Sequence, residues 1–184
     1  MDAIELMVQE HTHIKRMLKV LRNMCLRVLN NEIIDYDDFY KAIDFVRNYA
    51  DKHHHGKEEA VLFKKMGDEL GERVSKGPVA GMLVEHDFGR LYMQNLEAAV
   101  EKYKNGDKDA RLDIIGNAVG YADLLNRHID KEDSVIYTFA RRALNEGAIA
   151  DVNEKCQQVE KEAEGSGVQN KYLALVDEFE KKYI

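Results

Sequence analysis

Apolar residues recur at helical spacing along almost the whole chain, and no stretch alternates convincingly between apolar and polar positions. The clearest stripe lies within residues 2–30 and comprises Ile4, Met7, Ile14, Leu18, Leu21, Cys25 and Val28. A stripe of this length on one face predicts a long amphipathic helix. The chain is therefore predicted to be all-α.

Turn-forming residues divide the remaining pattern into further helices. The acidic stretch at 35–38 predicts the start of a second helix, which continues to about residue 70. Gly77 and Pro78 mark the entry to a third helix, and the NGD sequence at 105–107 separates it from a fourth helix that runs to about residue 144. Four long helices with short connections predict an antiparallel up-down-up-down four-helix bundle over residues 1–145.

Residues 146–184 predict one or two additional C-terminal helices packed on the same domain, with a break at the GSG sequence at 165–167. The segment after this break carries an apolar stripe of Val168, Tyr172, Leu175, Val176 and Phe179. Such a stripe either covers the bundle or forms a homodimer, and the sequence favours neither alternative.

Composition and charge exclude several classes of protein. The 184 residues are 45% hydrophobic and 33% charged, which is typical of a folded globular domain. A net charge of -7 without a basic stripe argues against nucleic acid, and the lack of a long apolar run argues against a membrane partner. No signal peptide is recognisable, so a cytoplasmic protein is expected. Cys25 and Cys156 are interpreted as packing thiols because two isolated cysteines form no disulfide framework.

Each of the four long helices places one histidine on its apolar stripe. These histidines are His11, His54, His86 and His128. The second helix contains three consecutive histidines at 53–55, and residues three, four and seven positions apart share a helix face. By this criterion His54 points inward, whereas His53 and His55 are interpreted as exposed.

Two of the helices also add a glutamate one turn after the histidine. Glu58 follows His54 and Glu132 follows His128, each at a spacing of four. One inward histidine is usually an ordinary core residue, and one HxxxE motif means little in a chain this acidic. Six convergent polar groups are different, because buried carboxylates without a cation carry a large desolvation penalty. The six residues are therefore predicted to bind metal.

The chemistry of these side chains narrows the choice of metal. Imidazole and carboxylate suit iron, manganese, zinc or copper, and the set has no thiolate that would favour a structural zinc site. Six ligands are too many for one zinc ion, so two metals bridged by the glutamates fit better. Ferritin-like centres use Glu-x-x-His repeats, a spacing present here only at Glu10 and His13, which disfavours that chemistry.

The six candidate ligands occur in an order that resembles the H-HxxxE-H-HxxxE signature of hemerythrin-like proteins. The flanking sequences EHTHI, HHHGKEEAVLF, VEHD and RHIDKEDSVIY are also similar to the ligand helices of that family. The resemblance covers about residues 1–145 and implies a four-helix bundle with a non-heme di-iron centre, with manganese or zinc as alternatives. It implies one iron held by His11 and His54, a second held by His86 and His128, and bridging carboxylates from Glu58 and Glu132.

Two features differ from the oxygen-carrying hemerythrins. Met82 stands four residues before His86, where those proteins have another histidine, and Glu132 replaces an aspartate at a spacing of five. The set of four histidines and two glutamates is similar to that of iron-cluster repair proteins and hemerythrin-like sensors. The resemblance fixes the cofactor better than the activity. We expect a protein that binds O2 or NO for transport, storage or sensing, because no substrate pocket, cofactor loop or nucleophile constellation is legible in the sequence. The alternatives are a di-iron enzyme acting on peroxide, O2 or NO, and an iron donor in iron-centre repair.

Several residues beside the candidate ligands have two interpretations. Glu59 and Glu85 are interpreted as solvated charges, with hydrogen bonding to a ligand histidine as the alternative. Arg90 either neutralises a nearby acid or faces solvent. Tyr121 is interpreted as a core tyrosine with a hydrogen-bond partner elsewhere, the alternative being donation to an iron-bound ligand.

Overall fold

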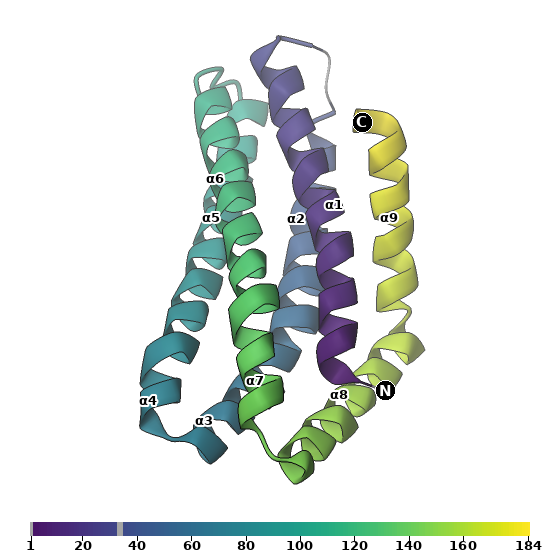
Figure 1. The fold of residues 1–184 in the computed structure, drawn as a ribbon. Coiled ribbons are helices and arrows are strands. Elements are labelled where there is room, and N and C mark those ends of the chain that lie inside the picture. The colour runs from purple at the N-terminus through teal and green to yellow at the C-terminus, as the bar shows by residue number, and fades with distance from the viewer. Residues whose placement is uncertain (1, 33–34) are drawn as a thin grey trace.

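The computed structural model describes residues 2–32 and 35–184, and every regular element within these ranges is a helix. Figure 1 shows four long helical columns that run antiparallel, followed by two further helices. The first two columns are α1 (Ala3–Leu29) and the run α2 (Asp37–Phe45), η1 (Val46–His55), η2 (Glu58–Phe63) and α3 (Lys64–Leu70). The other two are the run α4 (Glu72–Val74), η3 (Ser75–Val79) and α5 (Ala80–Lys104), and the run α6 (Ala110–Lys131), η4 (Glu132–Ile136) and α7 (Tyr137–Ala143). The predicted all-α bundle is confirmed.

Carboxylates and a glycine shape the backbone at the ends of the columns. The Asp2 carboxylate accepts a hydrogen bond from the backbone N–H of Glu5 and so caps α1. Asp35 accepts in the same way from the backbone of Asp37 at 2.9 Å, at the start of α2. Gly106 adopts a φ of 106° between α5 and α6, a conformation that glycine reaches without steric cost.

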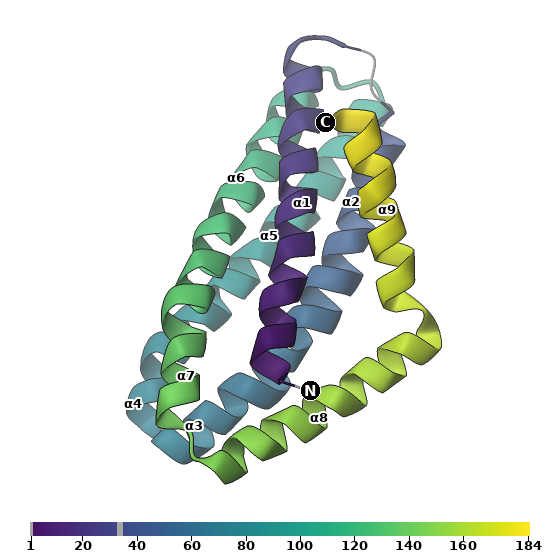
Figure 2. The ribbon, with the colours of Figure 1, turned by 45° about the vertical axis from the view of Figure 1, so that its right-hand side comes forward.

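The C-terminal segment forms α8 (Glu146–Ser166) and α9 (Val168–Tyr183), separated by Gly167 in the left-handed conformation. Figure 2 shows α8 crossing one end of the bundle and α9 returning alongside it. Tyr172, Val176 and Phe179 of the α9 stripe are buried. The stripe therefore covers the bundle, while a homodimer stays a prediction.

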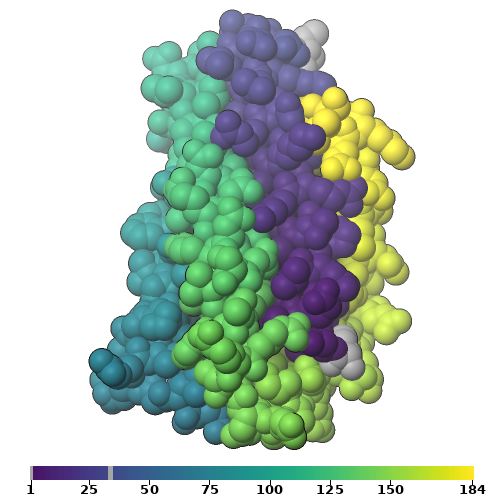
Figure 3. Space-filling view, viewed as in Figure 1, coloured from purple at the N-terminus to yellow at the C-terminus, as the bar shows by residue number. Residues whose placement is uncertain are grey.

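The hydrophobic core is divided in two along the bundle axis. On α1, Ile4 and Met7 belong to one apolar cluster, whereas Ile14 and Leu18 belong to the other. His11 lies between these two pairs, in a buried polar layer. Figure 3 shows α1 packed between the α6–α7 column and α9, so that side chains close over the interior on this face. The apolar clusters thus exclude water from the polar layer on both sides.

The segments that carry the histidine triplet and the two candidate glutamates are π-helical. They are η1, η2 and η4, and a π-helix forms hydrogen bonds between residues five apart, so each turn holds more residues than an α-helical turn. Which side chains face the interior therefore shifts away from the 3.6-residue period. No described helix has the length and apolar character needed to span a bilayer.

Candidate metal centre

The six predicted ligands meet in the polar layer between the two apolar clusters. They come from all four columns, and each is at most 1% exposed. The six are His11, His54, Glu58, His86, His128 and Glu132. Residues up to 121 positions apart in the chain are brought together because each column directs one or two of these side chains toward the bundle axis.

One group of donor atoms surrounds a point between α1 and the second column. His11, His54, Glu58 and Glu132 each place one nitrogen or oxygen within 4.8 Å of the others. The His11 Nε2 atom lies 3.3 Å from Glu132 Oε2, and His54 Nε2 lies 3.7 Å from Glu58 Oε2. The group offers two imidazole nitrogens and two carboxylates to one ion.

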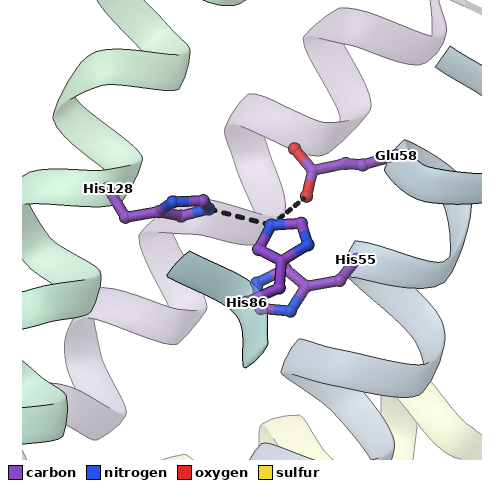
Figure 4. A group of neighbouring side chains, drawn as sticks. All are labelled: His55, Glu58, His86 and His128. Atoms are coloured by element: carbon purple, nitrogen blue, oxygen red, sulfur yellow. Dashed lines mark hydrogen bonds and ion pairs between the residues drawn. The ribbon is translucent and has the colours of Figure 1, made fainter. Parts of the chain in front are cut away.

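A second group lies beside the first and shares Glu58 with it. His55, Glu58, His86 and His128 also offer donor atoms within 4.8 Å of one another. Figure 4 shows His86 pointing toward both His128 and Glu58, and the respective distances from His86 Nε2 are 3.0 and 3.5 Å. Glu132 reaches this group too, because its Oε1 atom lies 3.0 Å from His128 Nε2. Both glutamates therefore lie between the two groups.

Most of the inward-facing donor atoms have no hydrogen-bond partner among the described residues. Buried atoms without one include His11 Nε2, His54 Nε2, Glu58 Oε2 and both carboxylate oxygens of Glu132. A buried polar group without a partner costs about 1–3 kcal/mol, and more when it is charged. Five such atoms converging on one layer are costly unless a cation completes them. The donor set thus fits a metal centre.

The outward nitrogen of each candidate ligand histidine donates to a carboxylate. The pairs, from Nδ1 to oxygen, are His11 with Asp133 at 2.7 Å, His54 with Glu10 at 2.8 Å, His86 with Glu59 at 2.7 Å, and His128 with Glu85 at 2.8 Å. A carboxylate only accepts, so Nδ1 carries the proton and Nε2 is left as the donor for a metal. The same Nδ1–carboxylate pair occurs on all four columns, which indicates that the four histidines belong to one metal centre.

Comparison with known families agrees with this geometry. The family model for the hemerythrin HHE cation-binding domain matches residues 2–140. The chain belongs to the hemerythrin HHE family. No curated protein and no solved structure shows a significant match. The family is one of cation-binding domains, and the buried histidine and glutamate groups of this HHE domain fit a metal site.

The interpretation of Glu59 and Glu85 as solvated charges is wrong. Glu59 on η2 reaches His86 on α5, and Glu85 on α5 reaches His128 on α6. Each carboxylate orients a histidine of a different column, so spacing within one helix cannot reveal the pair. Arg90 does neutralise nearby acid, since its guanidinium donates to Glu59 at 2.6 Å.

The interpretation of His53 and His55 as exposed is also wrong. They are 6% and 5% exposed, and His54 between them is fully buried. His53 Nε2 lies 3.0 Å from Glu10 Oε1, while His55 stacks on His86 with the ring centroids 3.9 Å apart. The π-helix and neighbours on both sides bury all three rings. A period of 3.6 residues cannot predict this arrangement.

His55 and His86 cannot bind the same ion in this arrangement. Their rings are parallel to within 9°, and the centroid distance makes them a stacked pair. An imidazole nitrogen directs its lone pair in the plane of its ring, and a ligated iron or zinc lies about 2.1 Å away in that plane. Two stacked planes cannot both contain one ion. His55 therefore supports the ring of His86, and its Nδ1 donates to Asp51 at 3.3 Å.

A third group of histidine and acid lies around Lys57 and was missed by sequence reasoning. Glu10, His53 and Glu160 offer donor atoms within 4.8 Å of one another. The Lys57 ammonium donates to both glutamates and is fully buried. Its positive charge already occupies the position that a metal would take. This group is an ion-pair network that ties α8 to the metal centre through Glu10.

Tyr137 is a further residue of the site that sequence reasoning missed. Its hydroxyl donates to Glu58 Oε1, and its ring is parallel to that of His11 with centroids 5.6 Å apart. It comes five residues after Glu132 in the chain, on the apolar face of the fourth column. The hydrogen bond fixes one oxygen of Glu58 and leaves the other, Oε2, facing the centre.

The Tyr121 hydroxyl has no hydrogen-bond partner among the described residues, although the residue is only 1% exposed. The interpretation that this tyrosine is hydrogen-bonded elsewhere in the core is therefore wrong.

Protonation of the centre follows from its burial. Burial and the adjacent Glu132 raise the pKa of Glu58 well above its usual range, which favours its neutral form when no metal is bound. Burial also disfavours the charge on Glu132, but the surrounding histidines His11, His128 and His86 hold its pKa well below the usual range. Burial and the nearby His11 lower the pKa of His54 to about 4, so the ring is neutral at pH 7. A metal ion bound here would therefore compete with a proton for this pair of carboxyl groups.

Proposed function

We propose that this HHE domain holds a carboxylate-bridged di-iron centre. The observation that carries the proposal is the pair of donor groups that share Glu58 and are both reached by Glu132. In this arrangement His11 and His54 would hold one iron, and His86 and His128 would hold the other. Iron suits a set of imidazoles and carboxylates that contains no thiolate.

We further propose that the centre binds O2 or NO. With two histidines and the two shared glutamates as its ligands, each iron would keep coordination positions for a small ligand. Iron, when bound, supplies the electrons and the coordination position for a diatomic molecule. The chain supplies the environment of the centre. Its two apolar clusters exclude bulk water, and the Tyr137 hydroxyl holds Glu58 in place by a hydrogen bond.

The second supporting feature is the set of outward carboxylates. Each of the four ligand histidines donates Nδ1–H to Asp or Glu, which raises the basicity of Nε2 and fixes the ring orientation. This increases affinity for a metal and leaves no freedom for the rings to turn away. The chain therefore presents a centre that is arranged for metal before metal binds.

The first test is elemental analysis of purified protein without an affinity tag, followed by anaerobic titration with NO and exposure to O2. About two irons per chain with a reversible optical change support the proposal. A matched pair of variants is Glu58→Gln, which removes a bridge, and Glu69→Gln on the surface, which should behave as wild type. Less than one iron per chain, or sustained turnover of peroxide without reversible binding, contradicts it.

A further inference from the structure

A chain of charged side chains runs from α8 to the candidate metal centre. Glu160 on α8 and Glu10 on α1 both accept hydrogen bonds from the Lys57 ammonium. Glu10 in turn accepts from Nδ1 of His54 at 2.8 Å. We propose that Glu160 is a positioning residue for the metal centre and acts through this chain on His54. The proposal rests on the proposed role of His54 as a metal ligand.

Glu10 is the most deeply buried of the four carboxylates that accept from the candidate ligand histidines. Its side chain is 5% exposed, whereas those of Asp133, Glu59 and Glu85 are 32%, 30% and 23% exposed. Water screens the charges of the three more exposed carboxylates, but it reaches Glu10 very little. A change in the charges around Glu10 is therefore felt at His54 with little screening.

The cation beside Glu10 is buried in the same way. The Lys57 side chain is fully buried, whereas Arg90 and Lys131, which pair with two of the other carboxylates, are 40% and 44% exposed. A surface cation can replace its carboxylate by water at little cost, but a buried ammonium depends on its protein partners. The partners of Lys57 thus decide how strongly its charge acts on Glu10.

Glu160 keeps this group of charges negative. The His53 ring touches both carboxylates, with Nε2 3.0 Å from Glu10 and 3.3 Å from Glu160. With a neutral imidazole the group has one positive and two negative charges, so a net negative charge remains behind His54. Without the Glu160 charge, Lys57 and Glu10 would cancel. The Nδ1 proton of His54 would then be held less strongly, and its Nε2 would be a weaker donor to a metal.

Glu160 is itself held by the last helix of the chain. Gln169 on α9 donates from Nε2 to Glu160 Oε2 at 2.6 Å, and the other oxygen, Oε1, accepts from Lys57. Both Glu160 and Gln169 lie beyond residues 2–140, which match the family model. In this proposal the C-terminal helices have a second task besides covering the bundle, because they fix the charges behind one ligand histidine.

The test compares Glu160→Gln with Glu162→Gln. Glutamine keeps an oxygen that can accept from Lys57 but removes the charge, and the exposed Glu162 loses the same charge on the same helix. The first readout is the histidine Nδ1–H signals in the proton–nitrogen NMR spectrum of the metal-free full-length protein. We expect the His54 signal to move upfield in Glu160→Gln, because a weaker hydrogen bond deshields the proton less. The His128 signal should not move, and Glu162→Gln should match wild type.

The second readout is the affinity for each of two iron(II) ions, measured by competition with a chelator. A direct partner of a ligand histidine is worth about 10- to 100-fold in metal affinity, so a residue that acts through that partner should be worth less. We expect Glu160→Gln to weaken one of the two affinities by about two- to tenfold and to leave the other unchanged. The reduction potential of one iron should also rise, because a weaker donor favours the ferrous state.

A second variant separates the position of Glu160 from its charge. Gln169→Leu removes the hydrogen bond that holds Glu160 but keeps the carboxylate. It should move the His54 signal in the same direction by a smaller amount. An unmoved His54 signal in both folded variants would overturn the proposal, and so would equal weakening of both iron affinities in Glu160→Gln.

Failure of this proposal is distinguishable from failure of the di-iron centre. Wild-type protein that binds two irons, together with an unmoved His54 signal in Glu160→Gln, would overturn the role of Glu160 alone. Wild-type protein that binds no iron would overturn the di-iron centre, and with it the effect of Glu160 on a metal. The NMR comparison on metal-free protein would then still decide whether Glu160 positions the His54 ring.

Discussion

The imidazole rings of His55 and His86 stack with their centroids 3.9 Å apart and their planes 9° apart. His55 comes from η1 and His86 from α5, so the contact joins two columns of the bundle. The triplet therefore divides among three tasks: His53 contacts Glu10, His54 points into the centre, and His55 holds the ring of a candidate ligand. This division explains why three adjacent polar residues can all be buried.

The stacking predicts that His55 is not a metal ligand. We expect His55→Phe to keep the metal content of wild type, because phenylalanine preserves the stack but offers no nitrogen. His86→Phe, the matched change on the other ring, should lose about one metal per chain. Elemental analysis of both variants measures this. Loss of metal in His55→Phe would mean that the ring turns and coordinates when metal is present.

Acid should destabilise the metal-free protein through His55. Burial and the nearby His86 lower the pKa of His55 from 6.5 to about 3, so between these values the unfolded chain binds a proton that the folded chain excludes. This contribution to the free energy of unfolding is fully present above pH 6.5 and is lost as the pH falls below that value. Relative to His55→Phe, wild type should lose about 1.4 kcal/mol per pH unit near pH 5. Urea unfolding of both proteins from pH 7 to 5 tests this, and parallel curves would refute it.

Substitution of the adjacent residues Glu58 and Glu59 in the second column should change metal binding in different ways. Glu58→Gln removes a candidate bridge shared by both donor groups and should reduce the metal content to one ion per chain or fewer. Glu59→Gln leaves a hydrogen bond to His86 but loses the charge, and should weaken metal affinity by about 10- to 100-fold while keeping two sites. Competition with a chelator distinguishes the two results. Equal loss in both variants would argue against bridging by Glu58.

The buried Lys57 should be important for stability. Lys57→Met removes the only cation between Glu10 and Glu160 among the described contacts and leaves Glu10 buried, so we expect a loss of about 3–5 kcal/mol in the free energy of unfolding. Lys52→Met on the exposed side of η1 is the matched control and should stay within about 0.5 kcal/mol of wild type. Similar values for both variants would show that the network carries no net stabilisation.

Removal of the metal should lower the thermal stability of the protein. The unpartnered donor atoms of the centre gain partners only when a cation is bound, and an ion that binds the folded chain alone stabilises it by mass action. We expect chelation to lower the midpoint of thermal unfolding and readdition of iron to restore it. Calorimetry of both forms measures the shift, and coincident curves would contradict a metal centre formed by these atoms.

The sequence by itself determined the helical class, the positions of the main breaks and the set of six candidate ligands. These features depend on local chemistry. Apolar periodicity specifies amphipathic helices. Asp35 accepts a hydrogen bond from the neighbouring backbone, and Gly106 adopts a positive φ between two helices. A spacing of four places Glu58 on the same helix face as His54. Each can be predicted without knowing which helices are neighbours.

Only the tertiary structure decided what surrounds the ligands. Glu59 finds His86, Glu85 finds His128, and Glu10 finds His54 across column boundaries, at distances that no spacing within one helix encodes. The π-helical turns change which positions of the second column face the interior, and His53 and His55 are buried as a result. The ion pairs of Lys57 likewise exist because separate helices pack together, so their contacts are fixed by assembly of the bundle and not by local sequence.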